Sequence, residues 1–142
     1  MLVSVALPLP LFQPYTYAVP EELRARATVG SRVVVPVRGR REMGFVIGEG
    51  TLAEGVKAKP ILAAPDERPV LDAQLLELCT WIADYYIAPI GMVLRTALPA
   101  ALSASDAPEP VQKTRRVAVL TRELPTLMER DETFAPGATR HS

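Results

Sequence analysis

The chain has 142 residues, which suits one domain and a tail. Its hydrophobic fraction of 49% is enough for a core, and its formal net charge of zero excludes a uniformly basic coat for nucleic acid. One cysteine allows no internal disulfide, and the only histidine is His141, so a zinc or catalytic-histidine site is not expected.

The N-terminal segment MLVSVALPLP has no basic region and is interrupted by prolines, unlike a signal peptide. No apolar run approaches the ~18–20 residues that a membrane-spanning helix needs. We therefore expect a cytoplasmic protein with no membrane contact.

Short β-prone segments, separated by proline and glycine, occupy the first half of the chain. These expected strands are 2–7, 15–19, 31–37, 42–50 and 59–65, and the third and fourth form a hairpin. Five short strands at close spacing favour a curled, barrel-like sheet of about five to six strands.

A helical pattern of apolar residues follows, beginning at Asp72 as N-cap and ending at Pro89. A shorter helix is expected over 90–98. The fold class is therefore α+β, a small curled sheet braced by one long and one short helix. We expect the domain to span 1–102, a linker 103–112, and a polar segment 113–142 that is too poor in apolar residues to fold alone and whose one candidate strand is 115–120.

The chemistry of an enzyme is missing from the sequence. No phosphate-binding GxxxxGK[ST] loop occurs, and Cys79 falls on the apolar side of the expected helix, where a packed thiol is favoured over a nucleophile. Asp66 and Glu67 are adjacent acids in a turn-like segment with nothing nearby to tune them. We expect no enzymatic activity and no cofactor.

Two features could bind DNA. The expected loop of the hairpin, 38–41, reads RGRR, so Arg38, Arg40 and Arg41 beside Gly39 could hold phosphates, although a solvated basic turn is the alternative. Tyr15 and Tyr17 alternate on one strand and could stack on a base, although a place in the core is the favoured interpretation.

Two further groups have a structural and a functional interpretation. Lys57 and Lys59, ahead of the fifth expected strand, could contact phosphate or simply protect a sheet edge. For Trp81, Tyr85 and Tyr86 on the long helix, packing onto the sheet is the favoured interpretation.

Three segments together resemble the N-terminal domain of the PriA replication-restart helicases, over about residues 3–102. These are the opening VALPLPLFQPYTYAVP, the hairpin VGSRVVVPVRGRREMGFVIG, and W-I-A-D-Y-Y-x-x-P-I-G-x-V-L-x-x-A-L-P over 81–99. The resemblance implies a 3′ DNA-binding domain, which holds the 3′ end of the nascent leading strand at a stalled or branched fork.

The resemblance also implies which residues form the pocket. The positions matching the family's pocket are Tyr15, Thr16, Tyr17, Gly39 and Lys59, with Arg38 adjacent. Thr16 stands where the family has an aspartate, and a hydroxyl offers fewer acceptors than a carboxylate, so selectivity for a free 3′ end is in question.

The resemblance implies partners and cofactors as well. DNA, as a fork 3′ end or a single strand, is the expected partner, and other primosome proteins and single-stranded DNA-binding protein are further ones. ATP and zinc belong to the complete family protein, and 113–142 resembles only the start of the winged-helix domain that follows there. The alternative to DNA binding is a protein-interaction module.

Overall fold

The computed structural model describes residues 1–102, 104 and 114–119. The chain divides into two units, Met1–Val111 and Gln112–Ser142, and the fold below is that of the first. In the second unit, residues 114–119 are exposed and form neither helix nor strand. The strand expected at 115–120 is therefore absent over 115–119, and Leu120 lies outside the described residues. The expected linker, apart from Ala104, and most of 113–142 lie outside them too.

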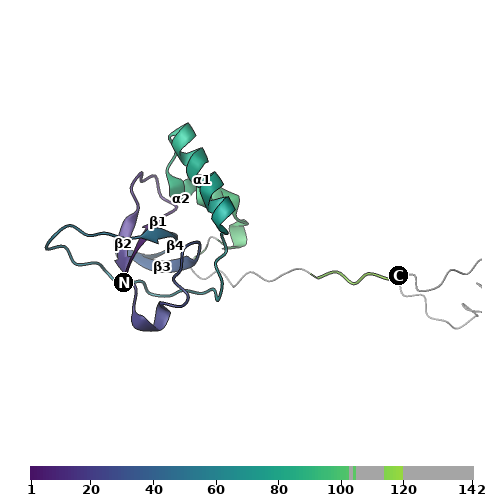
Figure 1. The fold of residues 1–142 in the computed structure, drawn as a ribbon, viewed down its shortest axis with the longest axis horizontal. Helices are drawn as coiled ribbons and strands as arrows, with labels where there is room; N and C mark the ends of the chain where they lie inside the picture. Colours follow the sequence, from purple (N-terminus) through teal and green to yellow (C-terminus); the bar gives the residue numbers. More distant parts are fainter. Residues whose placement is uncertain (103, 105–113, 120–142) are drawn as a thin grey trace, which may run out of the picture. The chain divides into compact units, whose positions relative to one another are not determined.

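Four antiparallel strands form one sheet in the order β2-β1-β4-β3. The strands are β1 (Leu2–Ala6), β2 (Tyr15–Ala18), β3 (Arg32–Val37) and β4 (Arg40–Glu49), and they lie below the two helices in Figure 1. β-Branched and aromatic residues dominate them, which suits a pleated, half-buried surface. A register shift between Ser4 and Val5 bends β1 against the long strand β4, as a bulge does.

The segment 59–63 closes the curled sheet by joining its two edge strands. Ala18 of β2 donates its N–H to the carbonyl of Lys59 (2.9 Å), and the N–H of Ile61 donates to the carbonyl of Ala18 (2.9 Å). On the other side, Val34 of β3 donates to Ala63 (2.8 Å). The expected fifth strand is thus a bridging segment, so the barrel-like sheet is confirmed with four strands rather than five to six.

Alternation along the strands sends one set of side chains into the curl of the sheet. This inner core includes Val3 and Val5 from β1, Tyr17 from β2, Val33 and Val35 from β3, and Val46 from β4, together with Ile61 of the closing segment. Because the side-chain period of a strand is two, the neighbouring residues face outward.

The helices α1 (Ala73–Tyr86) and α2 (Ile90–Ala97) cover the outer face of β4 and β1. The carboxylate of Asp72 caps α1 by accepting the N–H of Leu75 (2.7 Å), as expected from the sequence. Cys79 is buried against Phe45 and Leu94, so its interpretation as a packed thiol is confirmed. At Gly91 a Cβ would lie 1.7 Å from the carbonyl oxygen of Leu7, so only glycine lets α2 approach the end of β1 this closely.

A buried ion pair connects the sheet to the end of the domain. Arg32, fully buried on the outer side of β3, donates from Nε to one oxygen of Asp66 (2.7 Å) and from Nη2 to the other (2.5 Å). Its Nη1 donates to the carbonyl of Leu102 (2.8 Å), in the short 3-10 helix Ala100–Leu102. Asp66 thus has a structural role that no local pattern in the sequence indicated.

The described part of the chain offers neither a membrane-spanning helix nor a metal-binding cluster. None of its helices is long and apolar enough to cross a bilayer. The same residues contain no cluster of acidic, histidine or cysteine side chains suited to hold a metal ion.

Candidate nucleic-acid interface

The hairpin between β3 and β4 ends in a two-residue turn, Arg38–Gly39. Both residues have positive φ, 49° and 79°, which is the signature of a type I′ turn. Val37 and Arg40 are the last paired residues before the turn, so Arg40 and Arg41 belong to β4 rather than to the loop. The turn therefore has two residues instead of the four, RGRR, that were expected from the sequence.

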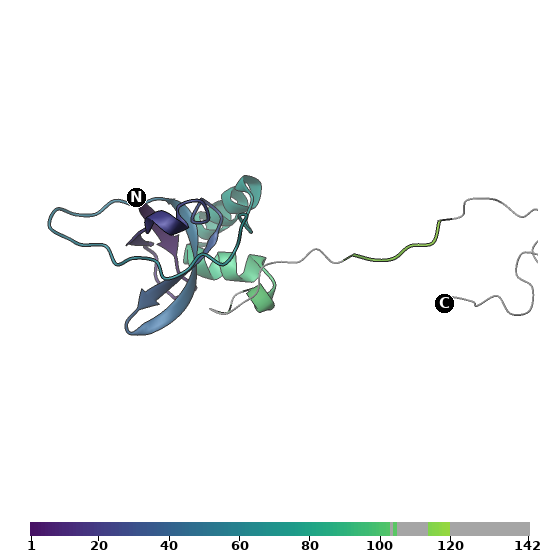
Figure 2. The same cartoon turned by 90° about the horizontal axis from the view of Figure 1, so that it is seen from below.

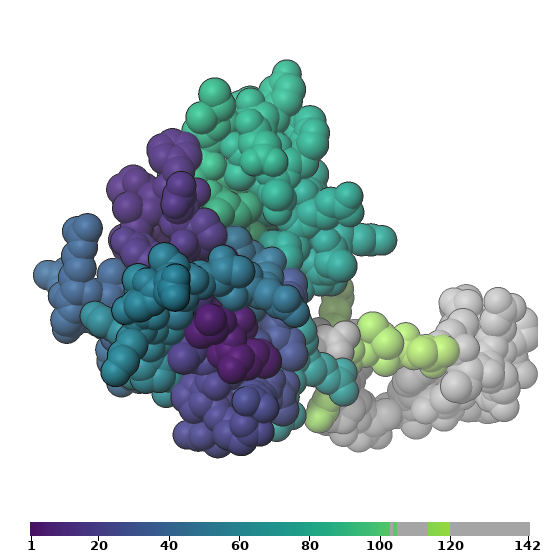
Figure 3. All heavy atoms as spheres, turned by 60° about the vertical axis from the view of Figure 1, so that its left-hand side comes forward, coloured from purple at the N-terminus to yellow at the C-terminus, as the bar shows by residue number. Residues whose placement is uncertain are grey.

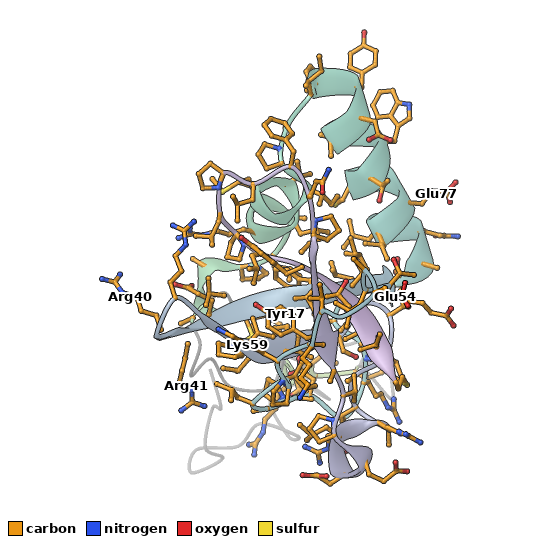
Figure 4. The ribbon with its side chains drawn as sticks, turned by 90° about the vertical axis from the view of Figure 1, so that its left-hand side faces the viewer. Tyr17, Arg40, Arg41, Glu54, Lys59 and Glu77 are labelled. Carbon is orange, nitrogen blue, oxygen red and sulfur yellow. The ribbon has the colours of Figure 1, made fainter. Side chains whose placement is uncertain are left out.

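This shorter turn separates the three arginines. Arg40 and Glu42 follow the inner face of β4, whereas Arg41, paired with Pro36, follows the outer face. Figure 4 shows Arg40 and Arg41 leaving the hairpin tip in different directions. The arginines therefore do not form one cluster: Arg38 and Arg40 line the same recess of the surface, and Arg41 does not.

The two tyrosines of β2 have different environments although they lie on one face. Tyr17 is only 5% exposed and donates its hydroxyl to the carbonyl of Pro36 across the curl (3.1 Å). Burial raises the pKa of Tyr17 above its ordinary value, with a smaller contribution from Tyr15. Tyr15, by contrast, is 39% exposed at the rim. The core interpretation is therefore confirmed for Tyr17, whereas the ring of Tyr15 is exposed and its stacking on a base stays a prediction.

Thr16 lies between the tyrosines and faces the other side of β2. Its hydroxyl donates to the carbonyl of Thr51 (3.0 Å), at the start of the long loop 50–58. Gly50 packs against it so closely that a Cβ there would lie 2.6 Å from Cγ2 of Thr16. The hydroxyl hydrogen is thus used within the protein, while the oxygen keeps a lone pair for a ligand.

Lys59 lies beside Tyr17 because the backbone of the closing segment holds it there. Its carbonyl accepts the N–H of Ala18, and its side chain is exposed. In Figure 4 Lys59 and Tyr17 lie near the centre of the view, and Arg40 and Arg41 lie at the hairpin tip. The closing segment therefore brings a cation from residue 59 next to aromatics from residues 15 and 17.

These residues line one surface pocket of about 380 Å³. Of the predicted site, it includes Tyr15, Thr16, Tyr17, Arg38 and Lys59. Leu52, Val56 and Lys57 from the loop 50–58 complete the wall, and no pattern in the sequence had marked the two apolar ones. Gly39, Arg40 and Arg41 are not among the lining residues. Gly39 supplies the turn, and Arg40 lines a neighbouring pocket.

The aromatic residues of α1 do not pack onto the sheet. Trp81, Tyr85 and Tyr86 are 56%, 67% and 68% exposed, and the rings of Trp81 and Tyr85 stack with centroids 5.0 Å apart. The interpretation of these residues as sheet-packing aromatics is wrong, because Cys79 and Ala83 occupy the buried side of the helix. Figure 3 shows the β1–β2 connection (purple) between the helices and the blue hairpin tip.

A pocket on a curled sheet that combines an exposed aromatic ring, an arginine and a lysine is an arrangement typical of nucleic-acid-binding modules. Residues 4–99 match the family model of the 3′ DNA-binding domain (3′BD) of PriA. The chain therefore belongs to the PriA 3′ DNA-binding domain family. This match confirms the resemblance noted in the sequence. Because the members of this family are DNA-binding domains, it also confirms the prediction that this chain is not an enzyme.

Curated relatives agree with the family match. The chain is 38% identical over 101 residues to the replication restart protein PriA of Chlamydia pneumoniae, covering 71% of this chain and 13% of that protein. It is 33% identical over 94 residues to PriA of Bacillus subtilis, covering 65% and 12%. It is 33% identical over 103 residues to PriA of Haemophilus influenzae, and the match covers 71% of this chain and 14% of that protein. The chain thus spans a small part of the length of these relatives.

Proposed function

We propose that this domain recognises the 3′ end of a DNA strand, as found on the nascent leading strand at a stalled or branched replication fork. The observation that carries the proposal is the pocket in which Tyr15, Thr16, Tyr17, Arg38 and Lys59 meet from three separate segments. A terminal nucleotide enters such a pocket, whereas a continuing strand meets its wall. The domain needs no metal ion or nucleotide cofactor for this, and a role at the fork places it in the cytoplasm.

Each residue has a defined part in the proposed complex. The exposed ring of Tyr15 stacks on the terminal base, an interaction worth ~1–3 kcal/mol. Arg38 and Lys59 bind phosphate oxygens through charge-assisted hydrogen bonds. Thr16 accepts the 3′-hydroxyl on its free lone pair, since its own hydrogen is directed to Thr51.

The test compares two labelled oligonucleotides that differ only in a 3′-hydroxyl or a 3′-phosphate, by fluorescence anisotropy. We expect tighter binding of the hydroxyl form, and loss of that difference in Thr16→Val, which keeps the β-branched shape. Equal binding of the two forms by the parent domain would refute recognition of the 3′ end and leave a general DNA-binding module.

Charge variants at the hairpin provide a matched comparison. Arg38→Asn removes the guanidinium but suits the left-handed turn position, so binding should weaken and depend less on salt while the fold is kept. Arg41→Gln removes the same charge from the outer face and should weaken binding less. If Arg41→Gln is as damaging as Arg38→Asn, the pocket does not position the phosphate.

A second proposal concerns protein partners, such as other primosome proteins or single-stranded DNA-binding protein. The exposed aromatic residues Trp81, Tyr85 and Tyr86 favour it, because aromatic side chains are enriched in the buried centres of protein interfaces. Fluorescence of Trp81 should change on titration with purified single-stranded DNA-binding protein, and an unchanged spectrum at saturating concentrations would argue against contact at this face.

A further inference from the structure

A second pocket, of about 360 Å³, adjoins the one described above. The two share Tyr15, Val37 and Arg38, which form a ridge between them. On its far side the second pocket is lined by the β1–β2 connection, with Leu9 and Leu11, and by Arg40 and Glu42 of β4. A ligand that stacks on Tyr15 in the first pocket therefore has a second recess directly beside it.

The apolar part of this recess is held by local backbone bonds. The N–H of Leu9 donates to the carbonyl of Leu7 (2.8 Å), and that of Leu11 donates to Leu9 (2.7 Å). Such bonds between residues two apart are those of γ-turns, which keep the connection compact. Leu9 also packs partly against the inner core, so the wall it contributes is anchored.

The polar part comes from the inner face of β4. Arg40 and Glu42 are two residues apart on the strand, so their side chains follow the same face. Arg40 is exposed and Glu42 is partly buried. Within the described residues no hydrogen bond or ion pair occupies the carboxylate of Glu42.

This combination suits a nucleotide more than a peptide or an anion alone. Leucine side chains and a tyrosine ring cover the faces of a planar base, two arginines offer phosphate contacts, and a carboxylate accepts hydrogen bonds. A carboxylate distinguishes bases by their amino groups: cytosine presents N4–H₂, whereas thymine presents a carbonyl oxygen at the same place.

We infer that this pocket is a subsite for the base next to the 3′-terminal one, and that Glu42 accepts a hydrogen bond from its amino group. The inference rests on the proposed function of the first pocket. Tyr15 separates the two bases, and Arg38, on the shared ridge, binds the phosphate that links them. The domain then prefers cytosine over thymine at the penultimate position while the first pocket holds the chain end.

The test uses short labelled oligonucleotides that differ only at the penultimate base, cytosine or thymine. We expect cytosine to bind about tenfold to a hundredfold more tightly, the effect of one hydrogen bond to a charged group. Glu42→Gln should bring the ratio close to one, because the amide donates to thymine as well as accepting from cytosine. Glu49→Gln, at the other end of β4, neutralises a matched carboxylate outside the pocket and should leave the ratio unchanged.

The two proposals fail separately. Equal affinity for cytosine and thymine, together with a preserved preference for the 3′-hydroxyl, overturns the subsite and leaves the first pocket standing. A cytosine preference that survives in Glu42→Gln overturns the role of Glu42. If the parent domain shows no preference for the 3′-hydroxyl form, recognition of the 3′ end by the first pocket is refuted. The assignment of the second pocket as the neighbouring subsite then falls with it. Circular dichroism of each variant confirms that the fold is kept.

Discussion

The buried ion pair between Arg32 and Asp66 makes a sharp prediction about stability. Both side chains are essentially inaccessible, at 0% and 1%, and two hydrogen bonds join them. Asp66→Asn leaves the guanidinium buried beside a neutral amide, and removing one partner of such a pair costs about 3–5 kcal/mol. Because the free energy of unfolding of a domain is only about 5–15 kcal/mol, this single change should remove a large part of the stability.

A double substitution tests the reason for that loss. In Arg32→Met/Asp66→Leu no buried charge remains, so the domain should lose far less than the sum of the single changes. Some loss should persist, because the carbonyl of Leu102 gives up its bond to Arg32, worth about 1 kcal/mol. The exposed pair Arg24–Glu21 (3.0 Å) is the control, and Glu21→Gln should cost at most about 0.5 kcal/mol.

Urea unfolding followed by far-ultraviolet circular dichroism measures six proteins: the parent, Asp66→Asn, Glu21→Gln, the double variant, and its two single variants Arg32→Met and Asp66→Leu. The buried charge is not the cause of the loss if Asp66→Asn lowers the free energy of unfolding by less than about 1 kcal/mol, or if the double variant is as unstable as the two single changes added together.

Two further predictions concern the aromatic residues. Because burial raises the pKa of Tyr17 above its ordinary 10.0, the folded state keeps this proton longer than the unfolded state, so stability should fall as the pH rises above about 10. Tyr17→Phe should make the free energy of unfolding less dependent on pH there, and an unchanged dependence would mean that Tyr17 is not the group responsible. The only tryptophan, Trp81, is 56% exposed, so acrylamide should quench its fluorescence almost as well in the native as in the unfolded domain. Strong protection in the native state would contradict this placement.

The helices and the hairpin could be predicted from local signals. Asp72 as N-cap and Pro89 as a stop mark α1 in the sequence, because capping and helix breaking depend on neighbouring residues alone. The run of valines in β3 likewise identifies a buried strand. The position of each strand in the sheet depends on partners far away in the chain, so the closing role of 59–63 was not predictable as such.

Local periodicity was enough to predict the α+β class, and the resemblance to the PriA domain identified the family and the candidate residues Tyr15, Thr16, Tyr17 and Lys59. The three-dimensional fold was needed to show that Tyr17 belongs to the core and Tyr15 to the surface, and that the rings of α1 face solvent. It also separated Arg38 and Arg40 from Arg41. Burial and pocket geometry depend on contacts between residues far apart in the chain. The curled sheet brings residue 59 against residue 18 and residue 36 against residue 17, and no local pattern encodes these contacts.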